Sequence, residues 1–251
     1  MVIRPIFSII TVTLNAATTI RHTVASVKAQ RTVSVEHIIK DGGSVDGTLE
    51  IALTENTNIR VLESSDRGIY DGMNQGFRVA TGDYVGFLNG DDAYVDESVL
   101  FDVAQVFESY RADFVYAGIL MLDNDSHYRR RWEDYRDPEP IISTSQFPHP
   151  ALFVRREVLE QIPGPFDPNL QISSDLKLGL ILVRELKLKG RALPRVVVSM
   201  ALGGKSTGSI RNIILGWSES RQAYNELFSS GGTAFVIKKV LSKIPQLFTI
   251  R

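Results

Sequence analysis

Short apolar segments alternate with segments of helical periodicity along the N-terminal part of the sequence. The apolar segments have the length of buried strands and cover residues 6–12, 35–39, 59–62 and 84–88. The segments between them repeat apolar side chains at helical spacing, as Ile69, Met73 and Phe77 do. Strands that alternate with helices in this way are typical of a parallel sheet with right-handed crossovers. We therefore expect an α/β fold with a mostly parallel central sheet flanked by helices.

The pattern is less regular beyond residue 90. Further helices are expected over residues 99–107, 156–162 and 176–186 and from residue 210 onward, and further strands over residues 114–117 and 195–200. The polar stretch 123–140 predicts a surface loop or hairpin. We expect one α/β domain over residues 1–206 and a helical, basic C-terminal extension over residues 207–251.

Composition excludes several classes of protein. The sequence contains no cysteine, so structural disulfides and thiolate metal sites are ruled out. A net charge of −1 gives no basic field for nucleic acid. The N-terminus lacks the pattern of a signal peptide, and the longest aliphatic run, near residues 178–183, is too short to span a bilayer. We expect a cytoplasmic protein, with contact at a membrane surface left open.

Two adjacent acids, Asp91 and Asp92, follow the apolar strand 84–88 behind Gly90. Neighbouring side chains point to opposite faces of a strand, so the two acids share one site only where the strand ends and the backbone turns. Buried carboxylates are costly without a positive partner, and a divalent cation that also holds a phosphate ester would supply one. The alternative is that the acids cap the next helix.

A second acidic loop, residues 41–48 (DGGSVDGT), follows the strand 35–39 and opens a helix. Ligands of open α/β sheets bind at the carboxyl ends of strands, where both acidic loops should meet. Gly42 allows close backbone approach, and Asp41 can accept hydrogen bonds from a nucleobase or a ribose. The alternative is a turn in which Ser44 and Asp46 only cap the helix.

The segment 66–76 (DRGIYDGMNQG) lies at a third junction between a strand and a helix. Arg67 can meet a diphosphate at the N-terminus of this helix, and Asn74 can face the ligand. Gly72 and Gly76 let the helix pack closely. The alternative for Arg67 is a surface ion pair with Asp66 or Asp71.

Four features further along the chain have equally plain alternatives. Asp175 begins a helix, where an acid is favoured by the helix dipole alone. His149 is a single loop histidine, a type that is usually structural. Lys205, in the sequence GGKS, can clamp a phosphate or belong to a simple turn. The basic residues after position 236 suit either an anionic membrane surface or a helix docked on the domain by its apolar face.

Taken together, these motifs resemble the family 2 glycosyltransferases of the GT-A fold. The resemblance covers roughly residues 5–206 and is carried by residues 8–15 (SIITVTLN), 41–48, 66–76, 80–84 (ATGDY), 89–92 (NGDD) and 172–175 (ISSD). Residues 68–74, His149 and residues 203–206 resemble one branch, the bacterial colanic-acid fucosyltransferase type. That branch builds exopolysaccharide, capsule or O-antigen.

The resemblance implies roles for individual residues. The first three strand ends would bind the nucleotide-sugar through Thr11, Thr13, Asn15, Asp41, Gly42, Arg67 and Asn74. Asn89 and Asp91 would occupy the Asp-x-Asp site, with Asp91 and Asp92 as ligands of Mn²⁺ or Mg²⁺. Asp175 would be the catalytic base, and His149 and Lys205 would contact the acceptor or the diphosphate. Two departures stand out: Asn89 replaces the first acid, and Leu14 replaces an aromatic residue that often stacks on the base.

The function expected from this resemblance is inverting, metal-dependent sugar transfer in bacterial surface polysaccharide biosynthesis. The donor would be linked to UDP, GDP or dTDP. The acceptor would be a saccharide on a polyprenyl diphosphate, reached through a peripheral membrane contact of the C-terminal tail. Two alternatives remain, a sugar-nucleotide nucleotidyltransferase and a non-catalytic binding module. The first is disfavoured because residues 13–18 contain neither glycine nor a basic residue.

Overall fold

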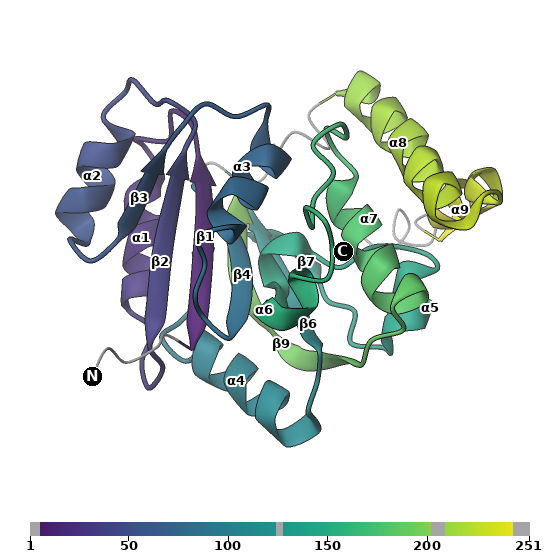
Figure 1. Ribbon diagram of the computed structural model, residues 1–251, viewed down its shortest axis with the longest axis horizontal. Helices are drawn as coiled ribbons and strands as arrows, with labels where there is room; N and C mark the ends of the chain where they lie inside the picture. The colour runs from purple at the N-terminus through teal and green to yellow at the C-terminus, as the bar shows by residue number, and fades with distance from the viewer. Residues whose placement is uncertain (1–5, 124–127, 202–208, 243–251) are drawn as a thin grey trace.

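The computed structural model describes residues 6–123, 128–201 and 209–242, which form a single mixed sheet with helices on both faces (Figure 1). The strand order is β3 (Arg60–Glu63), β2 (Val35–Asp41), β1 (Phe7–Thr13), β4 (Tyr84–Asn89), β8 (Leu152–Arg155), β6 (Phe114–Leu122), β9 (Gly190–Ala201) and β5 (Asp92–Tyr94), and β7 (Tyr128–Trp132) pairs with β6 outside this path. The fold is therefore α/β, as the alternation of strand and helix patterns predicts.

The N-terminal half of the sheet is parallel. β1 (Phe7–Thr13) lies between β2 (Val35–Asp41) and β4 (Tyr84–Asn89), and β3 (Arg60–Glu63) pairs with β2. The connecting helices are α1 (Ile20–Lys28), α2 (Thr48–Glu55) and α3 (Ile69–Phe77). Each of these elements confirms the expectation from the sequence to within a few residues, including the close packing of α3. A Cβ at Gly76 would lie 2.4 Å from Cγ2 of Ile10 on β1, so only glycine fits there.

The C-terminal half of the sheet differs from the mostly parallel arrangement that we expected. β8 (Leu152–Arg155) runs antiparallel to both β4 and β6 (Phe114–Leu122). β9 (Gly190–Ala201) is parallel to β6, while β7 (Tyr128–Trp132) forms an antiparallel hairpin with β6. β5 (Asp92–Tyr94) pairs with β9 and was not expected, since the acidic pair suggested either a metal loop or a helix cap.

Alternating side chains of the strands fill a core on each face of the sheet. Ile10 and Val12 of β1 pack on the face of α3 and α7 (Ser174–Leu180), whereas Phe7 and Ile9 pack on the face of α4 (Val99–Tyr110). The remaining helical segments are α5 (Pro138–Ile142), η1 (His149–Ala151), α6 (Arg156–Leu159) and η2 (Ile181–Glu185).

The C-terminal helices α8 (Ile210–Phe228) and α9 (Gly232–Leu241) form a pair beside α7, at the end of the molecule opposite α1 and α2 (Figure 1). Phe235 of α9 belongs to the same core cluster as Leu176 and Leu178 of α7. Helix α9 is therefore docked on the domain, which was one of the two alternatives for the basic tail. Within the described residues, no helix combines the length and the apolar character needed to cross a bilayer.

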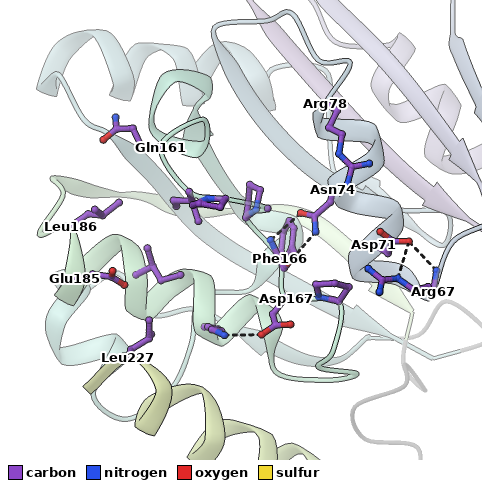
Figure 2. A pocket seen from close by; sticks show the side chains of 17 residues that line it. Arg67, Asp71, Asn74, Arg78, Gln161, Phe166, Asp167, Glu185, Leu186 and Leu227 are labelled. Carbon is purple, nitrogen blue, oxygen red and sulfur yellow. Dashed lines mark hydrogen bonds and ion pairs between the residues drawn. The ribbon is translucent and has the colours of Figure 1, made fainter. Parts of the chain in front are cut away.

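A cleft of about 500 Å³ opens between α3 and the segment 161–168 (Figure 2). Asn74 lies in its wall and is 4% exposed. Its amide nitrogen donates to the carbonyl of Phe166 at 2.6 Å, and its amide oxygen accepts from the N–H of Phe166 at 3.0 Å. Both polar atoms of Asn74 are thus used to hold a loop. Its predicted contact with the nucleotide-sugar stays a prediction.

Candidate active site

The loops that follow β1, β2 and β4 meet at one edge of the sheet. Thr13 is in register with Asp41, and the N–H of Gly42 donates to the carbonyl of Thr13 at 2.9 Å. The N–H of Gly90 donates to the carbonyl of Val12 at 3.2 Å. The sequence placed Asp41 and the acidic pair at a common edge, and the backbone hydrogen bonds show that arrangement.

The predicted nucleotide residues of β1 differ in their position. Thr11 is completely buried, and its hydroxyl pairs with Nε2 of His37 at 3.0 Å, so it supports the edge without lining it. Burial lowers the pKa of His37 to about 3 and keeps the ring neutral. Thr13, at the strand end, has a buried hydroxyl with no hydrogen-bond partner among the described residues. Asn15 accepts from the N–H of Val45 at 3.0 Å and joins the two loops.

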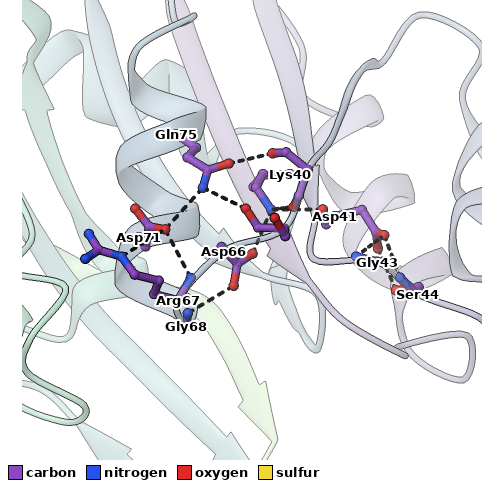
Figure 3. A network of polar contacts seen from close by, with 11 residues as sticks. Lys40, Asp41, Gly43, Ser44, Asp66, Arg67, Gly68, Asp71 and Gln75 are labelled. Carbon is purple, nitrogen blue, oxygen red and sulfur yellow. Dashed lines mark hydrogen bonds and ion pairs between the residues drawn. The ribbon is translucent and has the colours of Figure 1, made fainter.

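Asp41 is held by its own turn, as Figure 3 shows. Its carboxylate accepts from the N–H of Gly43 at 2.9 Å, and from the N–H and hydroxyl of Ser44 at 2.7 and 2.5 Å. Gly43 has φ +103°, a conformation that favours glycine. The structure thus contains the turn that was the alternative to a nucleotide contact for this loop. A carboxylate has about four acceptor positions, so three hydrogen bonds leave room for roughly one from a ligand.

A buried ion pair that the sequence analysis did not identify fixes the edge next to Asp41. Nζ of Lys40 donates to Oδ2 of Asp66 at 2.7 Å and to the carbonyls of Asp41 and Ser64 at 2.9 and 2.7 Å (Figure 3). The side chain of Lys40 is 0% exposed. This pair joins the end of β2 to the loop that precedes α3. A lysine at the end of an apolar strand is the only signal of it in the sequence.

Arg67 projects from that loop with its side chain 73% exposed. Its backbone N–H donates to Oδ2 of Asp71 at 3.1 Å, and its guanidinium lies 3.9 Å from the same carboxylate. The ion pair offered as the alternative is therefore present. It is long and exposed, and such pairs contribute little energy, so the guanidinium can turn toward an anion at small cost.

The acidic pair separates into one buried and one exposed side chain. Asp92 begins β5, is 1% exposed and accepts from the amide nitrogen of Asn89 at 3.1 Å. Asp91 is exposed. Burial raises the pKa of Asp92 well above its ordinary value, and the charge of Asp91 raises it further. The two acids therefore interact electrostatically, although one is buried and the other is exposed.

Whether these residues fit a divalent cation can be judged from their unpaired oxygens. Oδ1 of Asn89 and Oδ1 of Asp92 are buried and have no hydrogen-bond partner among the described residues. Oxygen atoms are the ligands of Mn²⁺ and Mg²⁺. No group of three or more metal-binding side chains occurs within the described ranges. The donor set fits an ion held by one or two carboxylates and completed by phosphate oxygens and water.

Asp175 lies in the first turn of α7, half-buried. Its Oδ2 accepts from the amide nitrogen of Gln146 at 2.7 Å, and its Oδ1 accepts from the N–H of Leu176 at 2.8 Å. Burial raises the pKa of this carboxyl, and electrostatic interactions with His149 and Lys239 oppose the rise. A carboxylate with a raised pKa is suited to accept a proton.

His149 connects Asp175 with the acidic edge. Its Nε2 lies 3.2 Å from the amide nitrogen of Asn89, which can only donate, so Nε2 is the acceptor and the ring is neutral. Burial lowers the pKa of His149, while interactions with Asp175 and Asp91 raise it. His149 therefore interacts electrostatically with the predicted base, Asp175, and with a predicted metal ligand, Asp91. Lys205, the other acceptor candidate, falls outside the described residues.

Solved structures identify the fold as that of the GT-A glycosyltransferases. S. aureus TarS 1–349 superposes with a TM-score of 0.71 at 17% identity, covering 93% of this chain and 70% of that one. The Pyrobaculum calidifontis mannosyltransferase PcManGT, solved with GDP-Man and Mn²⁺, superposes with a TM-score of 0.66 at 16% identity, covering 92% and 66%.

Sequence comparison then gives the family. Residues 8–162 match the model of Glycosyl transferase family 2. A PGL/p-HBAD biosynthesis glycosyltransferase of Mycobacterium bovis BCG is 32% identical over 176 residues, which are 68% of this chain and 67% of the relative. EpsJ of Bacillus subtilis, an uncharacterized glycosyltransferase, is 26% identical over 196 residues, covering 72% and 57%. The chain belongs to glycosyltransferase family 2 and is a glycosyltransferase. This assignment replaces the two alternatives from the sequence, a sugar-nucleotide nucleotidyltransferase and a non-catalytic binding module.

Proposed function

We propose that the protein transfers a sugar from a nucleotide-sugar donor to an acceptor hydroxyl with inversion at the anomeric carbon. The observation that carries this proposal is the position of His149. It hydrogen-bonds Asn89 at the end of β4 and interacts electrostatically with both Asp175 and Asp91. A proton acceptor and an acidic edge suited to a divalent cation therefore lie close to one another.

The donor would lie along the edge formed by β1, β2 and β4, with its nucleoside against Thr13, Asn15, Asp41 and Gly42. Solved relatives of this fold support a nucleotide-sugar, since TarS was determined with UDP-GlcNAc and PcManGT with GDP-Man. Arg67 would reach the diphosphate. The donor sugar would be linked to UDP, GDP or dTDP, as expected from the sequence.

Asp91 and Asp92, with Asn89 beside them, would hold Mn²⁺ or Mg²⁺. Such an ion, when bound, stabilises negative charge on a departing diphosphate. Because Asn89 brings no charge, the two aspartates supply the local acidic complement. The Mn²⁺ in the PcManGT structure supports the use of a divalent ion in this fold.

Asp175 would accept the proton of the acceptor hydroxyl. The acceptor oxygen forms a bond to C1 on the face opposite the leaving group, the bond from C1 to the diphosphate oxygen breaks, and the nucleoside diphosphate leaves with that electron pair. Gln146 holds Oδ2 of Asp175, which fixes the direction of the carboxylate. A single displacement of this kind needs no covalent intermediate on the protein.

The acceptor would be a lipid-linked saccharide at the inner face of the cytoplasmic membrane, in the pathway of a bacterial surface polysaccharide of the colanic-acid type. A row of exposed apolar side chains along α8 supports contact with lipid: Ile210, Ile213, Ile214 and Trp217.

The donor proposal is tested by thermal shift with UDP, GDP, dTDP and their sugars, each with and without Mn²⁺. One nucleotide family should raise the melting temperature, and Mn²⁺ should increase that shift. Asp92→Asn should remove the increase due to Mn²⁺ while keeping the shift due to the nucleotide. Failure of every nucleotide to stabilise the protein would contradict the proposal.

A further inference from the structure

A chain of hydrogen bonds connects the C-terminal helix α9 to the carboxylate of Asp175. Nζ of Lys239 donates to Oε1 of Gln146 at 2.9 Å, and Nε2 of Gln146 donates to Oδ2 of Asp175 at 2.7 Å. An amide has one accepting and one donating end, so a cation at its oxygen keeps its nitrogen toward the carboxylate. Lys239 thus determines which way Gln146 faces Asp175.

The environment of Lys239 makes this arrangement unusual for a lysine. Lys239 is 8% exposed and lies next to Ser220 of α8, whose hydroxyl is 3.5 Å from Nζ. Burial of an ammonium group is unfavourable unless nearby dipoles or charges compensate for it. Lys239 interacts electrostatically with Asp175 and counteracts the rise in the pKa of that carboxyl due to burial.

Helix α8 holds the same catalytic region through its backbone. The carboxylate of Glu219 accepts from the N–H groups of Gln171 and Ile172 at 2.8 Å each and of Ser173 at 3.0 Å. These three residues directly precede α7, and the first N–H groups of a helix need partners from outside the helix. Helix α8 therefore fixes the segment that carries Asp175. Helix α9 contacts the Asp175 side chain through Gln146.

We propose that Lys239 is a positioning residue of the transfer reaction, which fixes the Asp175 carboxylate through Gln146 and makes α8 and α9 part of the catalytic unit. The proposal rests on the proposed role of Asp175 as the base. It gives the C-terminal extension a function in catalysis that is separate from any contact with lipid.

Two other titratable groups lie around Asp175, and Lys239→Met does not alter either of them chemically. They are His149 from η1 and Tyr70 from α3, whose hydroxyl donates to the carbonyl of Ile172 at 2.8 Å and whose pKa is raised by burial and by Asp175. Glu219 of α8 acts on Tyr70. A change in the pKa of Asp175 in Lys239→Met therefore reports on Lys239, through its charge and through Gln146.

The first test compares Lys239→Met with Lys238→Met, a matched change of charge at the exposed neighbour. The assay is turnover of the nucleotide-sugar selected by thermal shift, with water as acceptor. We expect Lys239→Met to lower kcat about tenfold or more with KM for the donor unchanged within about twofold. We expect Lys238→Met to match the wild type and Lys239→Arg to recover most of the loss. Equal kcat for Lys239→Met and Lys238→Met would overturn the proposal.

A double-mutant cycle separates positioning from a general structural effect. If Lys239 acts through Gln146, the double variant with Gln146→Leu loses no more kcat than Gln146→Leu alone. Additive losses would contradict the proposal. If Lys239→Met does not fold, Gln146→Leu and Lys239→Arg decide: kcat must fall for the first and be largely kept for the second.

A measurement without any donor distinguishes this proposal from the proposed function. The carboxyl of Asp175 can be titrated by carbon-13 NMR and assigned with Asp175→Asn. Lys239→Met should raise its pKa and Lys238→Met should leave it unchanged. Full turnover by Asp175→Asn would end the proposed function. Loss of turnover by Asp175→Asn together with an unchanged pKa and kcat in Lys239→Met would end only this inference.

Discussion

The buried pair of Lys40 and Asp66 gives the most detailed prediction, because the contacts of both groups are known. Lys40→Met removes the ammonium group that donates to Asp66 and to the carbonyls of Asp41 and Ser64, at distances of 2.7 to 2.9 Å. Methionine keeps the length and the apolar stem of lysine. Asp66, whose side chain is 14% exposed, is left with a charge that has lost its partner.

The expected loss in the free energy of unfolding is about 3–5 kcal/mol, the range for breaking a buried ion pair on one side. Asp66→Asn should cost a similar amount, since it leaves an ammonium group buried without a charged partner. The double variant should be more stable than the sum of the single losses predicts, because no unpaired charge remains. The amide introduced by Asp66→Asn would also keep an oxygen for the N–H of Gly68, which Asp66 binds at 3.0 Å.

Urea denaturation of the four proteins, followed by circular dichroism, measures these differences. The nucleotide site is checked in parallel by the thermal shift due to the stabilising nucleotide, which should shrink in both single variants. A loss below about 1 kcal/mol for Lys40→Met, or strictly additive losses in the double variant, would refute the structural role of the pair.

Three further predictions follow from the structure. Burial raises the pKa of Asp175, so this carboxyl stays protonated to higher pH than an ordinary aspartate. We expect kcat to fall as the pH drops through that raised pKa. A pH–rate profile that stays flat down to the ordinary pKa range of aspartate would contradict this. Gly76→Ala should lower the free energy of unfolding by about 1–3 kcal/mol in urea, since the new Cβ would lie 2.4 Å from Cγ2 of Ile10, and wild-type stability would contradict the close packing of α3. The triple variant Ile210→Ser, Ile214→Ser and Trp217→Ser should lose flotation with vesicles of anionic phospholipid and keep the thermal shift due to the nucleotide. Flotation equal to that of the wild type would contradict the proposed contact of α8 with lipid.

The N-terminal half of the fold could be predicted because its elements are locally encoded. Buried parallel strands appear as continuous apolar runs, and α3 shows its spacing of four directly. β5 and β8 could not be found in this way. Each is short, and each exists because an antiparallel partner far away in the sequence pairs with it.

The candidate site shows the same division between local and distant information. Asp41 and Asn89 end strands and Asp91 lies just beyond one, so topology alone places them at one edge. Gln146, Glu219 and Lys239 carry no local pattern that marks them as neighbours of Asp175. For Lys239 the sequence indicated a solvated or membrane-facing position, whereas α9 buries the face of Phe235 and Lys239 instead. The partner of Asn74, the backbone of Phe166, is 92 residues away, so no local pattern indicates this contact.

The central claim is that Asp175 is the base of an inverting sugar transfer, and Asp175→Asn tests it most directly. Asparagine keeps the size of the side chain and can still hydrogen-bond Gln146, but it cannot accept the acceptor proton. We expect kcat to fall by about 10²–10⁴-fold while the dissociation constant of the stabilising nucleotide changes by less than about twofold. Turnover of Asp175→Asn close to that of the wild type, with nucleotide binding intact, would contradict the account.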